Sequence, residues 1–356
     1  MKMDHFRPTI ATINLGAIKR NTSKIIKKYP GYRYYMAVVK ADCYGYRGKK
    51  VTDAMLAGGV NSLAASLLEE GLTLREYYPN LPILLLTPVA RELLPMLADH
   101  RLMATVANLE QAQAAASIPS LDVLIRANGG CDILGGPTNK DDFEEIYRTL
   151  KCGKCNIKGI YLHSYNGESK DETQLEYNLF AEMTKDIDLS ALDIVSISCS
   201  LSLPRMEKLP YCNACRLGNI MYAIETEDEE LEDTFSLSSR ILSVYSLKKG
   251  QSVAYSHAYT AQADGEHIAA IPIGFGDGFS KTNIGRDVYI GDKRYPIVAV
   301  TMDISLVLVD STVSANDTVM LIRDNRHLDE ISAHIHGATE EAICALNKRV
   351  FREYID

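Results

Sequence analysis

The fold is decided by a short segment near the start of the chain, MAVVKADCYG at residues 36–45. Its first four residues are apolar, which is typical of a strand buried in a parallel sheet. A lysine and a polar turn follow, from Lys40 to Gly45. An open, doubly wound sheet would normally carry a glycine-rich G-x-G-x-x-G fingerprint here, and this turn lacks it. The segment therefore favours a (β/α)8 barrel, with the open sheet as the competing interpretation.

Strand-like and helix-like stretches alternate along the first two-thirds of the chain. This alternation predicts parallel βα units, and eight such units fit a (β/α)8 TIM barrel. The predicted strands are 34–39, 62–65, 83–86, 102–106, 123–126, 157–163, 194–198 and, less clearly, 214–222. The predicted helices are 48–57, 67–77, 109–116, 140–150 and 172–185. Glu69 and Glu70, in the second of these helices, are expected to be ordinary charges on a solvated face.

An acidic stretch at residues 225–233 is expected to be a solvated linker between two domains. We place the barrel at residues 1–232 and a second domain at 233–356, and residues 7–14 are a candidate for pairing with that second domain. Six β-rich stretches support the second domain: 236–247, 267–272, 287–290, 295–301, 306–309 and 318–322. Gly291-Asp292-Lys293 predicts a hairpin turn, and 328–334 and 339–346 are helix-like. The predicted fold class is α/β, a (β/α)8 TIM barrel followed by a C-terminal mostly-β domain.

Composition excludes several classes of protein. The chain has 356 residues, 46% of them hydrophobic and 24% charged, as in an ordinary soluble globular protein. No run reaches about 18 apolar residues, so no membrane span is predicted. The net charge of -8 argues against a nucleic-acid partner. Since the first residues lack an apolar signal core, a cytoplasmic location is expected.

The cysteines raise the question of a metal site. Cys152 and Cys155 form one pair with zinc-knuckle spacing, and Cys212 and Cys215 form another. The two pairs are much further apart than in usual zinc ribbons. A low cysteine density and the expected cytoplasmic location favour reduced, packed thiols, and no metal is predicted.

Lys40 is the strongest single catalytic candidate. In a barrel, residues at the carboxyl ends of strands face the active site. A partly desolvated lysine there suits Schiff-base chemistry. The alternative, from position alone, is a surface lysine in a loop.

The segment AVVKADCYG at residues 37–45 resembles the cofactor-lysine motif of the alanine racemases, which bind pyridoxal 5'-phosphate. Further motifs of that family follow in order through nearly the whole chain. They are the entry segment at 7–21, CRLGNIMY at 215–222, VAYSHAYTA at 253–261, IPIGFGDGF at 271–279, TMD at 301–303 and KRV at 348–350. Because several motifs at consistent spacing rarely arise by chance, the chain is identified as a member of this family.

The resemblance implies an amino-acid racemase that interconverts L- and D-alanine with two bases. Lys40 would bind the cofactor as a Schiff base and act on one face of the substrate Cα. Tyr255 would act on the opposite face from a second subunit, which implies a head-to-tail homodimer with shared active sites. Two bases on opposite faces are what inversion requires. From its position alone, Tyr255 could equally be one of many packed tyrosines.

The resemblance also implies the residues that hold the cofactor and the substrate. Arg216 would contact the pyridine nitrogen, and His163 would pack beside the ring. Met302, through its backbone N–H, and Asp303 would lie at the substrate carboxylate. The phosphate would be held by Tyr44, Ser200, Gly218 and Asn219. Without the family, His163 reads as a hydrogen-bonded core histidine and Asp303 as a residue that orients a loop.

One stretch departs from the family pattern. Alanine racemases usually carry a carbamylated lysine and then an arginine that contacts the substrate carboxylate. Residues 126–135 place Arg126 at the lysine position and Ile133 at the arginine position. Our hypothesis is that Arg126 itself supplies the missing positive charge; the alternative is that the carboxylate site is absent. The departure leaves open a racemase of serine or another amino acid, or a cofactor-binding homologue with little racemase activity.

Overall fold

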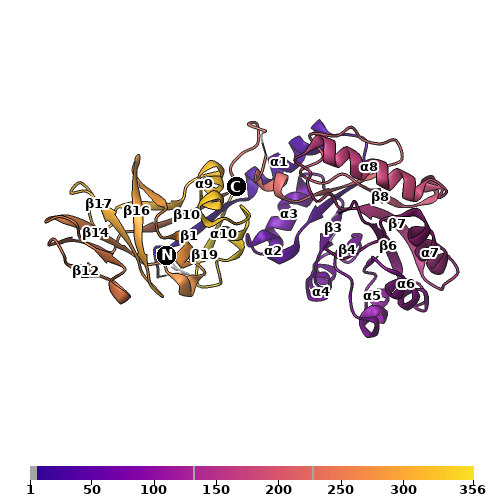
Figure 1. Ribbon diagram of the computed structural model, residues 1–356, viewed down its shortest axis with the longest axis horizontal. Helices are drawn as coiled ribbons and strands as arrows, with labels where there is room; N and C mark the ends of the chain where they lie inside the picture. Colours follow the sequence, from indigo (N-terminus) through magenta and orange to yellow (C-terminus); the bar gives the residue numbers. More distant parts are fainter. Residues whose placement is uncertain (1–5, 131–132, 227) are drawn as a thin grey trace. The chain divides into compact units, whose positions relative to one another are not determined.

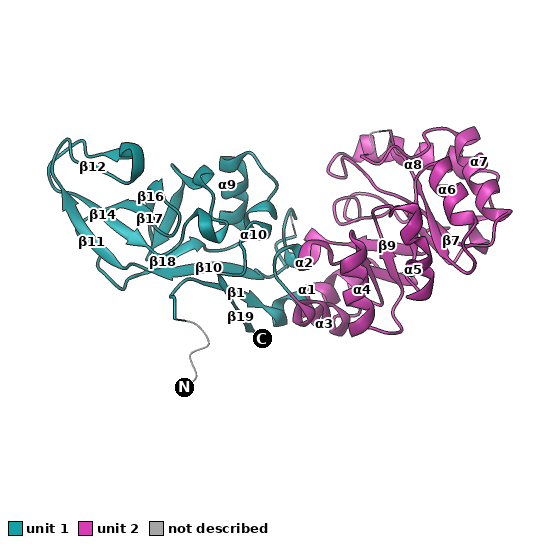
Figure 2. Cartoon of the chain, turned by 90° about the horizontal axis from the view of Figure 1, so that it is seen from below, with its two compact units in different colours: residues 1–18, 44–47, 222–356 teal, residues 19–43, 48–221 magenta. Residues whose placement is uncertain are grey.

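The computed structural model describes residues 6–130, 133–226 and 228–356. Three parts of the chain lie outside the described residues. They are the first five residues, on which the expected cytoplasmic location rests, residues 131–132 in the stretch that departs from the family pattern, and Glu227 in the acidic stretch. The chain divides into two compact units (Figure 2), one comprising 19–43 and 48–221, the other comprising the chain up to Ile18 with 44–47 and 222–356. None of the helices within the described ranges is long and apolar enough to cross a membrane.

The unit of residues 19–43 and 48–221 is a closed barrel of parallel strands. Two four-stranded sheets, β4-β3-β2-β9 and β5-β6-β7-β8, are joined by single bridges at Leu84–Met103 and Cys199–Arg216. The eight strands are β2 (Tyr34–Val38), β3 (Ser62–Ala65), β4 (Ile83–Leu85), β5 (Ala104–Val106), β6 (Asp122–Ala127), β7 (Asn156–Leu162), β8 (Ile194–Ser196) and β9 (Ala214–Leu217). The predicted barrel is therefore confirmed, and the indistinct last strand ends at Leu217, where a 3-10 helix (Asn219–Tyr222) follows.

Helices cover the outside of these strands, as Figure 1 shows for α4, α6 and α7. Several begin where the sequence offers a capping side chain: Asn108, Asn139 and Ser169 each accept a hydrogen bond from the backbone of the first turn. The helices along the barrel sequence are α1 (Leu15–Lys28), α3 (Lys49–Ala57), α4 (Leu68–Tyr77), α5 (Leu94–Asp99), α6 (Leu109–Ala116), α7 (Lys140–Lys151) and α8 (Lys170–Thr184). Most of the barrel strands are buried on both faces, because side chains fill the interior and helices cover the exterior.

The second unit is built on a nine-stranded sheet in the order β11-β14-β17-β16-β15-β18-β10-β1-β19. These strands are β1 (Ile10–Asn14), β10 (Phe235–Arg240), β11 (Ser243–Leu247), β14 (Glu266–Ile271), β15 (Asp287–Ile290), β16 (Lys293–Val300), β17 (Ser305–Val309), β18 (Thr318–Ile322) and β19 (Phe351–Ile355). A short hairpin, β12 (Ser252–Val253) and β13 (Tyr259–Thr260), and helices α9 (Asn325–Ile335) and α10 (Glu341–Cys344) complete the unit.

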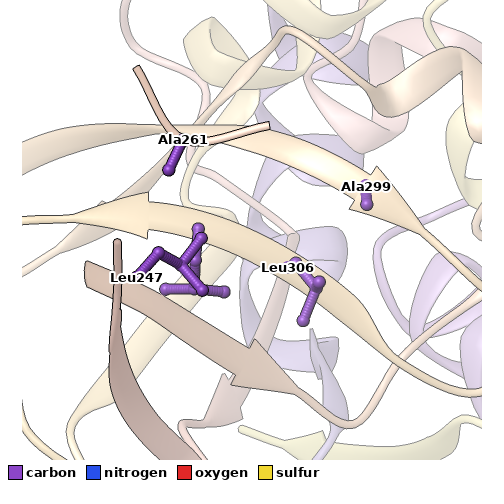
Figure 3. Packing of buried hydrophobic residues seen from close by; sticks show 5 residues of the cluster. Leu247, Ala261, Ala299 and Leu306 are labelled. Carbon is purple, nitrogen blue, oxygen red and sulfur yellow. The ribbon is translucent and has the colours of Figure 1, made fainter. Parts of the chain in front are cut away.

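Pairing in this sheet draws together distant parts of the chain. β1 pairs antiparallel with β10 and parallel with β19, so the candidate segment 7–14 contributes a strand to this unit. The compact units divide at Tyr222, whereas the sequence places the boundary between 232 and 233. Part of the sheet's core is a cluster of Leu247, Ala261, Ile268, Ala299 and Leu306, drawn in Figure 3. Burying each of its larger side chains stabilises the fold by about 1.5–3 kcal/mol.

Candidate functional site

Lys40 lies just beyond the carboxyl end of β2 and is partly buried. The four residues after it, Ala41 to Tyr44, all adopt left-handed backbone conformations, with φ between 51 and 57°. Each such residue costs about 1–2 kcal/mol when it is not glycine, so the surroundings must hold the turn in place. Asp42 accepts a hydrogen bond from the amide of Gly48 at 2.9 Å, which fixes the far end of the turn.

Glu70 holds the near end of that turn, which the sequence did not suggest. Its carboxylate accepts hydrogen bonds from the backbone N–H groups of Ala41 at 2.7 Å, Ser66 at 2.9 Å and Leu67 at 3.0 Å. The expectation that Glu70 is an ordinary solvated charge is therefore wrong, whereas its neighbour Glu69 is exposed. A glutamate at the third position of a helix, where it can bond back to the N-terminal backbone, was the signal that could have identified it.

Arg216 is buried inside the barrel on β9. One terminal nitrogen donates to the backbone oxygen of Ser196 at 3.1 Å and to its Oγ at 2.7 Å, and the other donates to the Leu162 oxygen at 2.6 Å. Burial lowers the pKa of Arg216 from its ordinary value. These bonds hold the guanidinium in one orientation, as a group that contacts a ring nitrogen requires.

Two cations flank one buried tyrosine inside the barrel. The ring of Tyr161, on β7, lies 5.1 Å from the Arg216 guanidinium carbon and 5.9 Å from that of Arg126. Burial raises the pKa of Tyr161, and both arginines oppose this shift. Its hydroxyl pairs with the Thr105 hydroxyl at 2.9 Å. Thus Arg126, buried on β6, belongs to the same cluster as Arg216.

Tyr161 was not singled out from the sequence. It lies two residues before His163, and side chains two apart in a strand point to the same side. That alternation was the available signal. His163 itself follows the end of β7 and is exposed.

Three of the residues predicted to hold a phosphate, Ser200, Gly218 and Asn219, follow the ends of β8 and β9. The hydroxyl of Ser200 accepts a hydrogen bond from the Gly218 amide at 2.7 Å and retains its own O–H as a donor. Asn219 follows at the start of the 3-10 helix. Tyr44 belongs to the other compact unit, where its buried ring lies 5.4 Å from that of Tyr222.

Tyr255 lies in the sheet-based unit, in the short loop between β12 and β13, and its side chain is 81% exposed. The backbone around it is left-handed, with φ of 61° at Ala254 and 57° at Ser256. Such positive φ values in residues other than glycine store strain, and such strain is typical of functional loops. Tyr255 is therefore not one of the packed tyrosines of the core.

Met302 and Asp303 form an exposed turn of the same unit. Asp303 accepts a hydrogen bond from Arg349 at 2.5 Å, and Arg349 also lies 3.3 Å from Asp277. Asp277 is fully buried and receives a bidentate bond from Arg7 at 2.5 and 2.8 Å. This ion-pair network gives Asp303 the geometry of a residue that orients the turn. Its contact with substrate stays a prediction.

Glycines seat the Met302 turn against its neighbours. The amides of Phe275 and Gly276 donate to the oxygens of Thr301 at 3.0 Å and Met302 at 2.8 Å. A Cβ at Gly274 would collide with both of these oxygens, and one at Gly276 would lie 2.9 Å from the Met302 oxygen. The glycines in the IPIGFGDGF motif therefore permit a close approach of two backbones.

The cysteine pairs do not form a recognisable metal centre. Burial raises the pKa of Cys212 to about 12 and that of Cys215 further still, while Cys152 is exposed. In the part of the chain that the structure describes, no group of three or more His, Cys, Asp or Glu side chains could hold a metal ion.

The residues present fit pyridoxal phosphate. Lys40, His163, Ser200 and Gly218 all follow strands of one parallel barrel, whose carboxyl ends lie at the same rim. The pairing of β2 with β9 sets Met36 opposite Arg216, so the buried cation lies on the strand next to that of Lys40. The hydroxyl and amide pair at Ser200 and Gly218 suits a phosphate, and Arg216 suits a ring nitrogen that is not to receive a proton.

Comparison with known proteins identifies the family of the chain. Residues 13–226 match the family model for the alanine racemase N-terminal domain, and residues 234–354 match that for its C-terminal domain. The chain is 28% identical to alanine racemase 1 of Bacillus subtilis, over 99% of this chain and 94% of that protein.

Solved structures give the same result for the fold. An alanine racemase from Bacillus anthracis, solved with bound L-Ala-P, superposes with a TM-score of 0.89 at 25% identity, covering 99% of this chain and 96% of that one. A histidine racemase from Leuconostoc mesenteroides shares the fold, with a TM-score of 0.83 at 19% identity, covering 98% of each chain. Given both domain matches and the site assembled above, the chain belongs to the alanine racemase family and is a pyridoxal-phosphate-dependent amino-acid racemase.

Proposed function

We propose that this protein interconverts L- and D-alanine, with Lys40 and Tyr255 of the partner subunit as the two bases. The observation that carries the proposal is the position of these two side chains on strained segments of the backbone. Lys40 stands on a strained turn at the rim of the barrel, and Tyr255 stands exposed on a strained loop of the other unit. An exposed tyrosine on such a loop suits a role in a site completed by a second subunit.

In this mechanism two side chains move one proton each. When bound, pyridoxal phosphate supplies an electron sink for the substrate Cα. On one face of the Cα, the Nζ of Lys40 removes or returns the α-proton. On the opposite face, the hydroxyl of Tyr255 does the reverse. Because removal and return occur on opposite faces, the configuration at Cα inverts.

Arg216 would keep the reaction confined to racemisation. A guanidinium held by three hydrogen bonds does not hand its proton to the ring nitrogen. This limits how far negative charge is drawn from the substrate into the ring. Side reactions such as transamination, which need that charge, are disfavoured.

Arg126 would supply the positive charge for the substrate carboxylate. It is buried in the barrel beside Tyr161, whose ring also contacts Arg216. Ile133, at the position where the family usually has an arginine, is 88% exposed and offers no charge. A racemase for serine or another amino acid is the second candidate, favoured by this altered carboxylate site.

The test is loss of a Cα deuterium label in ordinary water. A panel of L-amino acids is incubated with the cofactor-loaded wild type and with Tyr255→Phe. Exchange with inversion for alanine, abolished in one direction by Tyr255→Phe, is the expected result. Inversion of another amino acid alone would replace alanine as the substrate. A lysine-bound cofactor absorbance without any exchange would identify a cofactor-binding homologue and overturn the proposal.

A further inference from the structure

We propose that Glu70 is a positioning residue, whose carboxylate holds the turn after Lys40 and so fixes the direction in which the Lys40 side chain leaves its strand. The inference rests on the proposed function in one respect, because it takes Lys40 as the cofactor lysine. It concerns a residue outside the set predicted to hold the cofactor or the substrate.

Hydrogen bonds hold the backbone before and after Lys40, one to β3 and the other to a side chain of α4. On the upstream side, the amide of Val39 donates to the Ala64 oxygen at 2.8 Å. On the downstream side, the amide of Ala41 donates to Glu70 Oε1 at 2.7 Å. The Ala41 amide belongs to the peptide that joins Lys40 to Ala41, so its bond to Glu70 constrains the backbone directly at the Lys40 Cα and with it the direction of the Cα–Cβ bond. The Val39 bond lies one peptide further upstream and holds the end of the strand in place.

Glu70 is itself hydrogen-bonded to the backbone of the short connection between β3 and α4, Ser66 and Leu67. Its Oε2 accepts from the amides of Ser66 at 2.9 Å and Leu67 at 3.0 Å. The two carboxylate oxygens therefore have separate tasks, one facing the turn and the other facing the start of α4. A glutamine has only one acceptor oxygen, and its NH2 group would face a backbone N–H donor. Glu70→Gln must therefore lose either the bond to Ala41 or the bonds to Ser66 and Leu67.

The turn needs such an anchor because its conformation is intrinsically unfavourable. Ala41 has φ 51° and ψ 45°, in the left-handed region that residues with a Cβ avoid. Further bonds act elsewhere in the turn. The Gly48 amide donates to Asp42, the Cys43 thiol pairs with the Thr52 hydroxyl, and the Cys43 amide donates to the Val39 oxygen at 3.1 Å. The bond to Glu70 holds the peptide adjacent to Lys40. Without it we expect this peptide to rotate and to displace the amino group.

The experiment compares Glu70→Gln with Glu69→Gln, a matched change at the exposed neighbouring residue. The first readout is the rate at which the cofactor-free protein binds pyridoxal phosphate covalently at Lys40, followed by visible absorbance and by borohydride trapping. We expect this rate and kcat for alanine to fall about ten- to a hundred-fold in Glu70→Gln with little change in KM, since a displacement of about 1 Å costs this much. Glu69→Gln should match the wild type.

A second readout separates positioning from general disturbance. In Lys40→Ala, added methylamine supplies an amino group that the turn does not hold. The double variant Lys40→Ala with Glu70→Gln should therefore show the same methylamine-supported rate as Lys40→Ala alone, within about twofold, the usual limit for independent sites. Glu70→Asp keeps the charge but is too short to bond both Ala41 and the start of α4, so it should reproduce the loss seen in Glu70→Gln. It replaces Glu70→Gln in the experiment if the glutamine variant does not fold.

The outcomes distinguish this inference from the proposed function. If the wild type binds the cofactor covalently and racemises no amino acid, the proposed function fails, and the rate of covalent binding still tests Glu70. If Glu70→Gln and Glu70→Asp bind the cofactor at the wild-type rate, the inference is overturned. An equal loss in the methylamine-supported reaction would also overturn it, because the turn does not position free methylamine.

Discussion

Arg126 shows how much a single position could change the chemistry of this family. If it binds the substrate carboxylate, Arg126→Ala should raise KM for the amino acid by about ten- to a hundred-fold, because a hydrogen bond to a charged group contributes about 1.5–3 kcal/mol. Arg126→Lys keeps the charge without the forked geometry, so its KM should lie between those of the wild type and Arg126→Ala. Steady-state kinetics measure this, with Arg148→Ala on the exposed face of α7 as the control. An unchanged KM in Arg126→Ala would show that the carboxylate binds elsewhere.

His327 links folding to pH. It is buried in α9 against the ring of Tyr289, and burial lowers its pKa to about 4. The unfolded chain restores a pKa of about 6.5, so below that pH the unfolded state binds the extra proton. The free energy of unfolding should therefore fall by about 3 kcal/mol as the pH drops from about 6.5 to about 4.

The check is denaturant unfolding of the wild type and His327→Gln across that range of pH. The variant lacks the titrating group, so its free energy of unfolding should depend less steeply on pH by the same amount. Equal pH dependence in both proteins would contradict the assignment of the effect to His327.

At the scale of elements, the turn after the 3-10 helix Phe275–Asp277 depends on a glycine. Gly278 has φ +87°, and a Cβ there would collide with the carbonyl oxygen of Ala345. Gly250 has a similar φ of +80° with nothing within 4 Å of its Cβ position, so it is a matched control. Gly250→Ala should cost about 1–2 kcal/mol of stability from conformation alone. Gly278→Ala should cost at least about 3 kcal/mol, because the collision adds to the strain.

Denaturant unfolding of the two variants gives this comparison directly. The difference between them isolates the collision, since the backbone conformation is nearly shared. Equal losses in stability would mean that the Ala345 backbone moves aside freely.

The barrel strands and the turn after Lys40 were predictable from sequence, but the conformation of that turn was not. Short apolar runs alternating with helical patterns report burial, which decides strand position in a parallel barrel. The left-handed conformations of Ala41 to Tyr44 run against the preferences of those residue types. They exist because Glu70 and other neighbours impose them, and local sequence carries no record of such tertiary constraints. The pairing of Asp303 with Arg349 was missed for the same reason.

At the scale of the whole molecule, the proposed sharing of sites between subunits makes a quantitative prediction. Lys40→Ala and Tyr255→Phe are each expected to be nearly inactive as pure proteins. When the two are unfolded and refolded together, half of the dimers should combine one chain of each kind. In each mixed dimer one site receives both wild-type side chains, so about a quarter of the wild-type activity should return.

The mixing experiment also has a decisive negative result. If Lys40 and Tyr255 of the same chain serve the same site, no mixed dimer contains an intact site, and activity stays at the level of the single variants. The control mixes each variant with itself under the same refolding conditions.

The division of the chain was harder to predict than its fold class. Composition predicts a change from barrel to sheet near the acidic stretch, because strands and linkers differ in residue content. It could not locate residues 44–47, which join the sheet-based unit through packing of Tyr46 on Tyr222 and Phe235 at 4.3 and 5.3 Å. Contacts of that kind depend on the folded arrangement.

The pairing of β1 with β19 has a consequence for biosynthesis. The ribosome makes β1 (Ile10–Asn14) long before β19 (Phe351–Ile355), so at about 5–20 residues per second β1 waits on the order of tens of seconds for its neighbour. The barrel unit, complete by Met221, can fold meanwhile. A message cut short before Phe351 would yield a chain with a finished barrel and with β1 as a bare sheet edge, the kind of product that aggregates. This edge of the sheet therefore stays open until β19 has been synthesised, whatever the state of the barrel.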